Sequence, residues 1–413
     1  MSQPSDPPAV LNPIRRSLRD YHFARLQKEA PRAKVRVHII VGTRPELIKM
    51  APVIQEFRAS PHFDTKVVNT GQHVELVDRL FQNFGIIPDF DCELLLKGQA
   101  LPSLYARALE RFHGVVERER PDLILVQGDT ASAAAAAMVG FLHSIPVGHV
   151  EAGLRTHNLY SPFPEEFNRV TISQIATFHF APTQSAVRNL LAEGFAPSDI
   201  DMVGNTIVDA LQQVLAQARE FASAEVRDFF EKYAGRKKIL LTLHRREHSD
   251  EGLNEIFRVL GELAREFADE TAILYPVHFT PAIRAKARAC FGDTPNLSLV
   301  EPIDYFEFVS ILKNVDLIVS DSGGIQEESV ALRKPILILR DTSERMEVVE
   351  AGLGFLVGNN LPLLREKFAE WVTHGHDVPE NDLLRSNPYG TGDAAKKIRG
   401  IVERFFDGAS RHE

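Results

Sequence analysis

The stretch "KVRVHIIVGTRPELIKM", residues 34–50, contains the strand, turn and helix from which the fold is predicted. Its first half is rich in β-branched residues, which favour a strand, and the apolar residues of 45–60 recur at helical spacing. The same alternation continues along the chain and restarts near residue 205. Strands that alternate with helices form parallel, doubly wound sheets. The sequence therefore predicts an α/β protein with two Rossmann-like doubly wound domains that face a cleft.

Composition limits the classes of partner and compartment. The chain has 413 residues, of which 44% are hydrophobic, so each domain can bury a core of its own. Its net charge of -9 gives no reason to expect nucleic acid or an anionic membrane as a partner. Cys92 and Cys290 have no paired spacing, which suits a reducing cytoplasm. Residues 1–33 form a polar, partly helical extension without the apolar run of a signal peptide, so we expect a cytoplasmic protein.

The predicted strands of the first domain are followed by basic residues, which would bind an anion, and by an acidic residue, which would repel one. In doubly wound sheets ligands bind at the carboxyl ends of the strands. Arg44 and Lys49 follow the first strand at a helix N-terminus, which is a ready anion site. Asp129, in "QGDT", follows another strand, where a helix N-cap is the alternative interpretation.

The sharpest junction is "DLIVSDSGGIQEES", residues 316–329. Ser322, Gly323 and Gly324 lead from a strand into a helix that carries Glu328, and the two glycines allow backbone N–H groups to approach a ligand closely. "RDTSER" after the next strand adds Arg345. The pattern is neither a Walker loop nor GxGxxG, so we predict a phosphate on a ligand other than a dinucleotide.

A further strand end, "LLTLHRREH", places His244 before two arginines, Arg245 and Arg246, and this arrangement suits a diphosphate. No cluster of metal ligands is apparent, so no metal is predicted.

Two glutamates in "SPFPEEFNR", residues 161–169, point to a second kind of chemistry. Pro162 and Pro164 predict a stiff, extended connector that holds Glu165 and Glu166. One interpretation is an acidic helix N-terminus. The other is proton transfer, together with Asp129 and the Glu151 of "GHVEAGLR", at the uncharged part of a phosphorylated ligand such as a sugar.

At this point the motifs match a known family. "VGTRPELIKMAPVI", "TGQH", "GDT", "GHVEAGLRT", "YSPFPEEFNR", "VGNTIVDAL", "HRRE", "YPVH", "DSGGIQEE" and "RDTSER" resemble, in this order, the non-hydrolysing bacterial UDP-N-acetylglucosamine 2-epimerases over about residues 34–400. The resemblance implies a GT-B-like architecture: a first domain at 34–205, a UDP-binding domain at 206–385, and a C-terminal helix at 386–413 that crosses back to the first domain.

The resemblance also implies an activity. Family members interconvert UDP-GlcNAc and UDP-ManNAc by eliminating UDP to give 2-acetamidoglucal and adding it back, without metal or nicotinamide. The resemblance further implies that the protein is a homodimer and that it supplies ManNAc precursors for cell-surface polysaccharide.

Roles for individual residues follow from the same resemblance. Asp129, Glu151 and Glu165 would transfer protons and stabilise positive charge, with Glu166 the lesser partner, and His244 would support the diphosphate. The implied UDP ligands are Arg44, Lys49, Ser322, Gly323, Gly324, Glu328 and Arg345, with Phe308 against the uracil. A second, activating nucleotide site would use Gln72, Arg245 and His278.

Three positions depart from the family pattern. This chain has Met346 where the family has proline, Thr280 where it has asparagine and Glu75 where it has glutamine. The alternatives are an epimerase of a related nucleotide sugar of the 2,3-diacetamido uronic acid type, and an epimerase that hydrolyses the intermediate to ManNAc. More distant alternatives are a glycosyltransferase of the same fold and a nucleotide-sugar-binding regulator. The last two would have no need for all three carboxylates.

Overall fold

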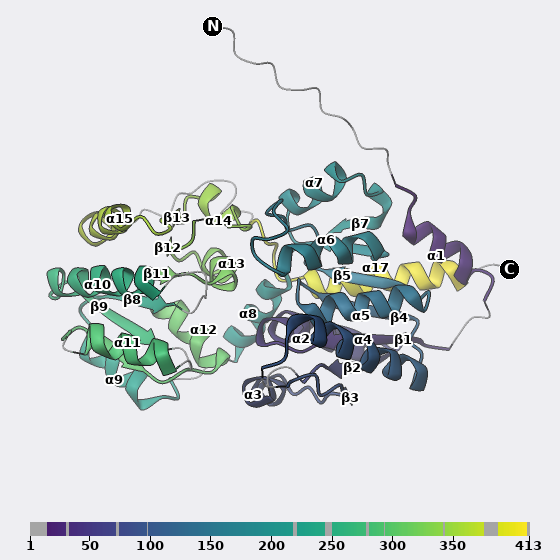
Figure 1. Cartoon of the computed structure of the whole chain (residues 1–413), viewed down its shortest axis with the longest axis horizontal. Coiled ribbons are helices and arrows are strands. Elements are labelled where there is room, and N and C mark those ends of the chain that lie inside the picture. Colours follow the sequence, from purple (N-terminus) through teal and green to yellow (C-terminus); the bar gives the residue numbers. More distant parts are fainter. Residues whose placement is uncertain are drawn as a thin grey trace, which may run out of the picture. The chain divides into compact units, whose positions relative to one another are not determined.

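The computed structural model describes residues 15–29, 33–71, 74–96, 98–217, 221–243, 250–277, 281–292, 294–341, 343–375 and 387–410. The chain divides into two compact units. The first comprises Met1–Thr206 with Asp393–Glu413, and the second comprises Ile207–Gly392 (Figure 1). Among the described residues, no helix is long and apolar enough to cross a membrane.

The first unit contains a parallel sheet with the strand order β3-β2-β1-β4-β5-β6-β7. Its strands are β1 (Val35–Val41), β2 (Phe63–Asn69), β3 (Phe90–Asp91), β4 (Leu123–Gln127), β5 (Val147–Val150), β6 (Phe178–Ala181) and β7 (Ile200–Met202). Its helices are α1 (Leu18–Leu26), α2 (Arg44–Ala59), α3 (Val74–Phe84), α4 (Leu101–Arg118), α5 (Ala131–Leu142), α6 (Glu165–Ile175), α7 (Gln184–Ala192), the 3₁₀ helix η1 (Pro197–Asp199) and α17 (Ala394–Ser410).

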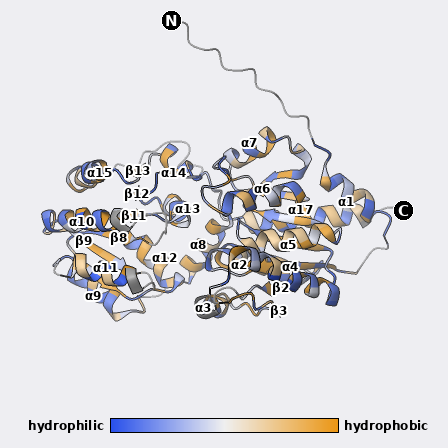
Figure 2. Ribbon diagram, viewed as in Figure 1, coloured by the Kyte–Doolittle hydropathy of each residue, from blue (hydrophilic) through white to orange (hydrophobic). Residues whose placement is uncertain are grey.

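The strand order decides which helices share a face of this sheet. The chain moves outward in one direction from β1 to β3 and in the other from β4 to β7, so right-handed crossovers place α2 and α3 opposite α4, α5 and α6. In agreement, α2 contacts α3, while α5 contacts both α4 and α6. Helix α5 is built mainly from alanine and other apolar residues, and Figure 2 shows its largely hydrophobic colouring. These small side chains suit a helix that packs against a sheet and two neighbouring helices.

The second unit repeats the same plan. Its parallel sheet has the order β10-β9-β8-β11-β12-β13. The strands are β8 (Lys237–Thr242), β9 (Thr271–Pro276), β10 (Leu297–Val300), β11 (Leu317–Ser320), β12 (Ile336–Ile338) and β13 (Gly354–Leu356). The helices are α8 (Thr206–Ala216), α9 (Ala224–Lys232), α10 (Asp250–Glu266), α11 (Pro281–Phe291), α12 (Tyr305–Asn314), α13 (Gly323–Ala331), α14 (Glu347–Glu350) and α15 (Leu361–His374). The predicted α/β class with two doubly wound parallel sheets is confirmed.

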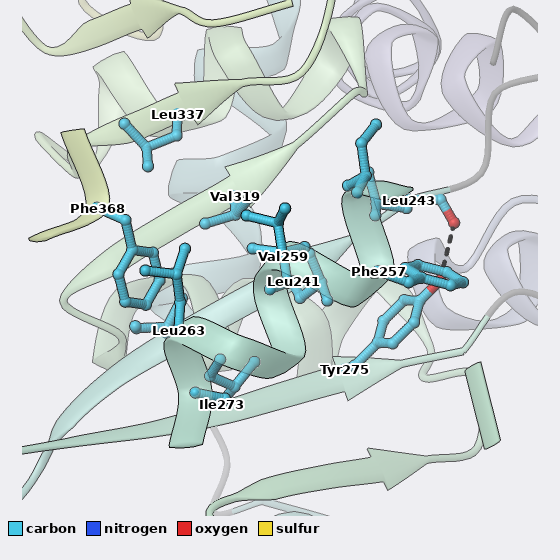
Figure 3. Packing of buried hydrophobic residues seen from close by; sticks show 14 of the residues in the cluster. Leu241, Leu243, Phe257, Val259, Leu263, Ile273, Tyr275, Val319, Leu337 and Phe368 are labelled. Atoms are coloured by element: carbon cyan, nitrogen blue, oxygen red, sulfur yellow. Dashed lines mark hydrogen bonds between the residues drawn. The ribbon is translucent and has the colours of Figure 1, made fainter. Parts of the chain in front are cut away.

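The core of the second unit lies between its strands and the helices packed on them. Leu241, Val319 and Tyr275 from the strands meet Phe257 and Leu263 of α10, and all are buried (Figure 3). Each such side chain contributes about 1.5–3 kcal/mol through removal of apolar surface from water. The Tyr275 hydroxyl donates to the Leu243 carbonyl at 3.2 Å, which satisfies the one polar group that this ring brings into the core.

Helix α1 and the C-terminal helix α17 lie side by side in the first unit (Figure 1). Phe23 of α1 packs edge-on against Phe405 of α17, with ring centroids 5.6 Å apart. The Asp199 carboxylate accepts hydrogen bonds from the Ser17 hydroxyl and, at 3.0 Å, from the Leu18 amide. Residues 17–26, although predicted to lie in a polar extension, are therefore packed into the first unit.

Candidate active site

The turn after β1 is fixed by a buried carboxylate. Thr43 is the N-cap of α2, and Glu46 completes a capping box. Glu46 accepts hydrogen bonds from the Gly42 and Thr43 amides at 3.1 and 2.7 Å, and from the Thr130 hydroxyl at 2.6 Å. Burial raises the pKa of Glu46, and the hydrogen bonds from Thr130 and Thr43 oppose this shift. Because Thr130 follows β4, Glu46 joins two neighbouring strand ends at the carboxyl edge of the sheet.

Gly42 is required in this turn by close packing. A Cβ atom there would lie 1.7 Å from the Thr70 hydroxyl oxygen, so no other residue fits without displacement of Thr70. The tight turn leaves Arg44, the first residue of α2, exposed at the helix N-terminus. That position favours an anion, as the sequence predicts.

Lys49 and Glu151 form an ion pair inside the first unit. Both side chains are 5% exposed, and Gln127 donates to the same Glu151 oxygen at 3.0 Å. Glu151 follows β5 with φ of +68°, a left-handed conformation that costs a non-glycine residue about 1–2 kcal/mol. Lys49, predicted as a nucleotide ligand, thus contacts a predicted acid/base group, and the pair holds Glu151 in its strained conformation.

Asp129 lies in the turn after β4 and is paired with Arg169 of α6, at 2.5 Å between Oδ2 and Nη2. Its backbone carbonyl accepts from Asn168 at 2.8 Å. The alternative of a helix cap is wrong for Asp129, because Thr130 is the N-cap of α5 and accepts from the Ala133 amide at 3.0 Å. Asp129 therefore remains a candidate for proton transfer.

A neutral histidine supports the same turn. His149 is fully buried and its Nε2 bonds to the Gly128 carbonyl at 2.8 Å. Burial lowers the pKa of His149 to about 4, so the ring is uncharged at neutral pH. The uncharged His149 ring thus stabilises the turn that carries Asp129 without adding a charge to it.

The two glutamates at 165 and 166 do not lie on a loop. Helix α6 begins at Glu165, with Pro164 as its N-cap residue, so the expected rigid connector ends before the carboxylates. The acidic pair occupies the first turn of the helix, where the helix dipole favours negative charge. The sequence interpretation that placed both on a connector is corrected in this respect, because the prolines restrict only the residues that precede the helix.

The environments of the two glutamates differ sharply. Glu166 is fully buried and accepts from the Thr156 and His157 amides at 3.0 and 2.9 Å and from Arg169 at 3.3 Å. Glu165 is half-buried. Burial raises the pKa of Tyr105 of α4, and the nearby negative charge of Glu165 raises it further. Glu166 therefore fixes the backbone at 156–157, whereas Glu165 is the more accessible of the two carboxylates.

Sequence reasoning missed four residues of this edge: Glu46, Tyr105, Asn168 and Arg169. The Tyr105 hydroxyl bonds to the Asn168 side chain, and Arg169 bridges Asp129 and Glu166. Asn168 and Arg169 stand in the quoted "EEFNR", and a signal for Arg169 was its helical spacing of three residues from Glu166.

In the second unit, the Gly-rich turn starts a helix as predicted. Ser322 is the N-cap of α13, and Gly323 and Gly324 are its first residues. The Ser322 amide donates to the Ser320 hydroxyl at 3.0 Å, which ties the turn to the end of β11. Within the described part of the chain, a Cβ atom on Gly324 would meet no atom inside 4 Å. Protein packing therefore does not require this glycine, and the space beside the helix N-terminus suits a bound anion.

The "RDTSER" loop packs against the same helix. Arg345 is buried and donates from Nε to Glu327 at 2.6 Å, and it also pairs with Glu344. Glu344 accepts from Arg340 at 3.1 Å. The Ser343 hydroxyl donates to Gln326 at 2.7 Å, so the loop that precedes Met346 is held to α13 by several bonds.

Two further predicted nucleotide ligands are described in this unit. Glu328 is buried within α13, and Phe308 is half-buried on α12. The remaining predicted residues lie outside the described residues: His244, Arg245, Arg246, Gln72, His278 and Thr280, together with the side chain of Glu75.

Comparison with known proteins gives a consistent result. The family model described as UDP-N-acetylglucosamine 2-epimerase matches residues 55–403. A UDP-N-acetylglucosamine 2-epimerase of Yersinia pestis is 40% identical over 370 residues, which cover 88% of this chain and 97% of that protein. Its counterpart from Bacillus subtilis is 40% identical over 380 residues, covering 92% and 97%. The crystal structure of UDP-GlcNAc 2-epimerase from Neisseria meningitidis bound to UDP-GlcNAc is 36% identical, with a TM-score of 0.82 over 90% of this chain and 100% of that chain.

The contrast between the two glutamates predicts unequal effects of their substitution on stability. Glu166→Gln should lower the stability of the first unit by about 1–3 kcal/mol, because Arg169 loses a buried charged partner. Glu165→Gln is the matched control and should change stability by no more than about 0.5 kcal/mol. Thermal melting of both variants measures the difference, and equal melting temperatures would contradict the structural role of Glu166.

Proposed function

This chain belongs to the UDP-N-acetylglucosamine 2-epimerase family, and we propose that it interconverts UDP-GlcNAc and UDP-ManNAc by elimination and re-addition of UDP. As a member of this family it is an epimerase and hence an isomerase. The observation that carries the mechanism is the set of carboxylates at the carboxyl edge of the first sheet, Asp129, Glu151 and Glu165, of which two are paired with cations.

The chemistry requires acid/base groups next to a sugar. The C2 hydrogen of the substrate is not beside a carbonyl, so direct deprotonation is difficult. Loss of UDP from C1 with loss of the C2 proton gives 2-acetamidoglucal, and re-addition with the proton on the other face gives the epimer. One base must accept the C2 proton, and one acid on the opposite face must deliver a solvent-derived proton to C2. Three carboxylates from separate elements supply enough groups for both steps.

The charges beside these carboxylates support the same proposal. The leaving diphosphate would be repelled by unpaired carboxylates. The Lys49 and Arg169 pairings reduce that repulsion and also stabilise the negative charge of a proton acceptor. Glu165 is half-buried, so its carboxylate is accessible to a substrate.

The second unit supplies the features that a nucleotide diphosphate needs. The N-terminus of α13 provides backbone N–H groups and a favourable dipole for the departing UDP. Arg345 brings a guanidinium beside this helix, and Glu328 supplies a carboxylate suited to the hydroxyl groups of a ribose. Phe308 on α12 offers an aromatic face for the uracil.

A homodimeric, cytoplasmic enzyme that feeds polysaccharide synthesis completes the proposal. It is supported by the family membership, and light scattering of the purified chain would measure its mass in solution.

Incubation of the purified enzyme with UDP-GlcNAc in D₂O tests the function. NMR should show UDP-ManNAc with deuterium at C2, because the C2 proton exchanges with solvent during elimination. Free ManNAc with UDP would indicate a hydrolysing enzyme instead. Absence of any conversion would contradict the proposed substrate and direct attention to the 2,3-diacetamido uronic acid nucleotides.

Glu165→Gln keeps the size of the side chain but cannot exchange a proton. Turnover should fall by about 10²–10⁴-fold, the usual loss for a general acid or base. UDP affinity should hardly change, because this carboxylate serves the sugar. Glu110→Gln, on the exposed face of α4, is a control and should keep normal turnover. If Glu165→Gln retains more than about a tenth of the turnover, its catalytic assignment is wrong.

Arg345→Ala should weaken UDP binding by about 1.5–3 kcal/mol, the range for a charge-assisted hydrogen bond. Calorimetry with UDP alone measures this. Arg340→Ala is the matched control, because it also removes a guanidinium from Glu344 but leaves the predicted UDP ligand in place. Equal losses of affinity in the two variants would mean that Arg345 acts only by holding the loop.

A further inference from the structure

Two histidines and a glutamate converge on the surface of the first unit, at the ends of α4 and α5. His113 and Glu117 lie one turn apart near the end of α4, and His143 is the C-cap of α5. His113 Nδ1 lies 2.9 Å from His143 Nε2, and Glu117 Oε1 lies 3.9 Å from His143 Nδ1. One ligand atom from each residue lies within 4.8 Å of the others, and this is the one such group of three among the described residues.

We propose that His113, Glu117 and His143 form a binding site for a zinc ion. Two imidazoles and a carboxylate are a ligand set that Zn²⁺ accepts, with water in the fourth position. Mg²⁺ and Ca²⁺ prefer oxygen ligands throughout, so the two ring nitrogens select against them.

The spacing of the three groups fits this ion. Zn²⁺ bonds of about 2.0–2.1 Å in a tetrahedral arrangement place neighbouring ligand atoms about 3.4 Å apart. That separation falls between the 2.9 Å of the two ring nitrogens and the 4.8 Å limit of the group, so small side-chain rotations complete the site. The two ring nitrogens lie at hydrogen-bond distance, and the ion would lie between them in place of that hydrogen bond.

The backbone around the three residues is already ordered. Helices α4 and α5 pack against one another along the sheet. The His143 amide donates to the Val139 carbonyl at 3.0 Å, and Arg120 donates to the His143 carbonyl at 2.7 Å. Because the ligands stand on fixed helices, binding the ion requires little additional ordering.

The position of the site predicts what the ion does. Each helix of a βαβ unit runs back across the sheet and ends where the next strand begins, so the ends of α4 and α5 lie at the amino edge. Asp129 and Glu151 follow strands at the opposite, carboxyl edge. The ion would therefore link α4 to α5 and stabilise the first unit without entering the chemistry.

Calorimetric titration of the chelator-treated, full-length chain without a polyhistidine tag tests the proposal, with ZnCl₂ as the probe and MgCl₂ for comparison. The wild type should bind one Zn²⁺ at this site and melt at a higher temperature when zinc is present. His113→Ala and His143→Asn should each weaken that binding by about ten-fold or more and abolish the thermal shift. Turnover of both variants should remain at the wild-type level.

A second exposed histidine provides the control. His62 lies in the same unit and pairs with Glu403 at 2.9 Å, so His62→Ala removes a histidine beside a carboxylate without touching the cluster. It should leave the zinc affinity and the thermal shift unchanged. The proposal is overturned if the wild type fails to bind zinc, or if His113→Ala and His62→Ala lose the same affinity.

Discussion

The buried ion pair between Lys49 and Glu151 is the interaction on which the carboxyl edge of the first sheet depends. An isolated charge in the interior is very costly, and removal of one partner of a buried pair typically costs about 3–5 kcal/mol. The pair joins α2 to the end of β5, and Gln127 at the end of β4 bonds to the same carboxylate. Three elements of the sheet edge therefore meet at one oxygen, which also fixes a residue with positive φ.

Arg169 likewise compensates negative charge at the end of the neighbouring strand β4. It contacts Asp129 in the turn after β4 and Glu166 in its own helix. The two cations, Lys49 and Arg169, offset the repulsion between carboxylates that lie close together at one edge. An elimination that releases a diphosphate needs such balance, because the base must be charged while the leaving group remains nearby.

The sequence predicts the fold and the positions of strand ends well, because both follow from local periodicity. It cannot predict which side chains pair, since Lys49 and Glu151 are far apart in the chain and meet only through the strand order. The cap interpretation of Asp129 failed because the neighbouring Thr130 makes a better N-cap. The His113, Glu117 and His143 cluster left no sequence signal for a similar reason, because its third member comes from the next helix.

Helix geometry explains why two adjacent, identical side chains play different parts. Successive residues of an α-helix point about 100° apart, so Glu165 and Glu166 cannot face the same surroundings. At the start of α6 the charge of Glu165 raises the pKa of Tyr105, whereas the Glu166 carboxylate points to the backbone amides of Thr156 and His157. Arg169 stands three residues after Glu166 and pairs with it. By holding Arg169, which also contacts Asp129, the buried Glu166 orients the proposed acid/base residue Asp129. The two adjacent glutamates thus divide the work: Glu166 holds the structure, and the proposed proton transfer is left to its less buried neighbour Glu165.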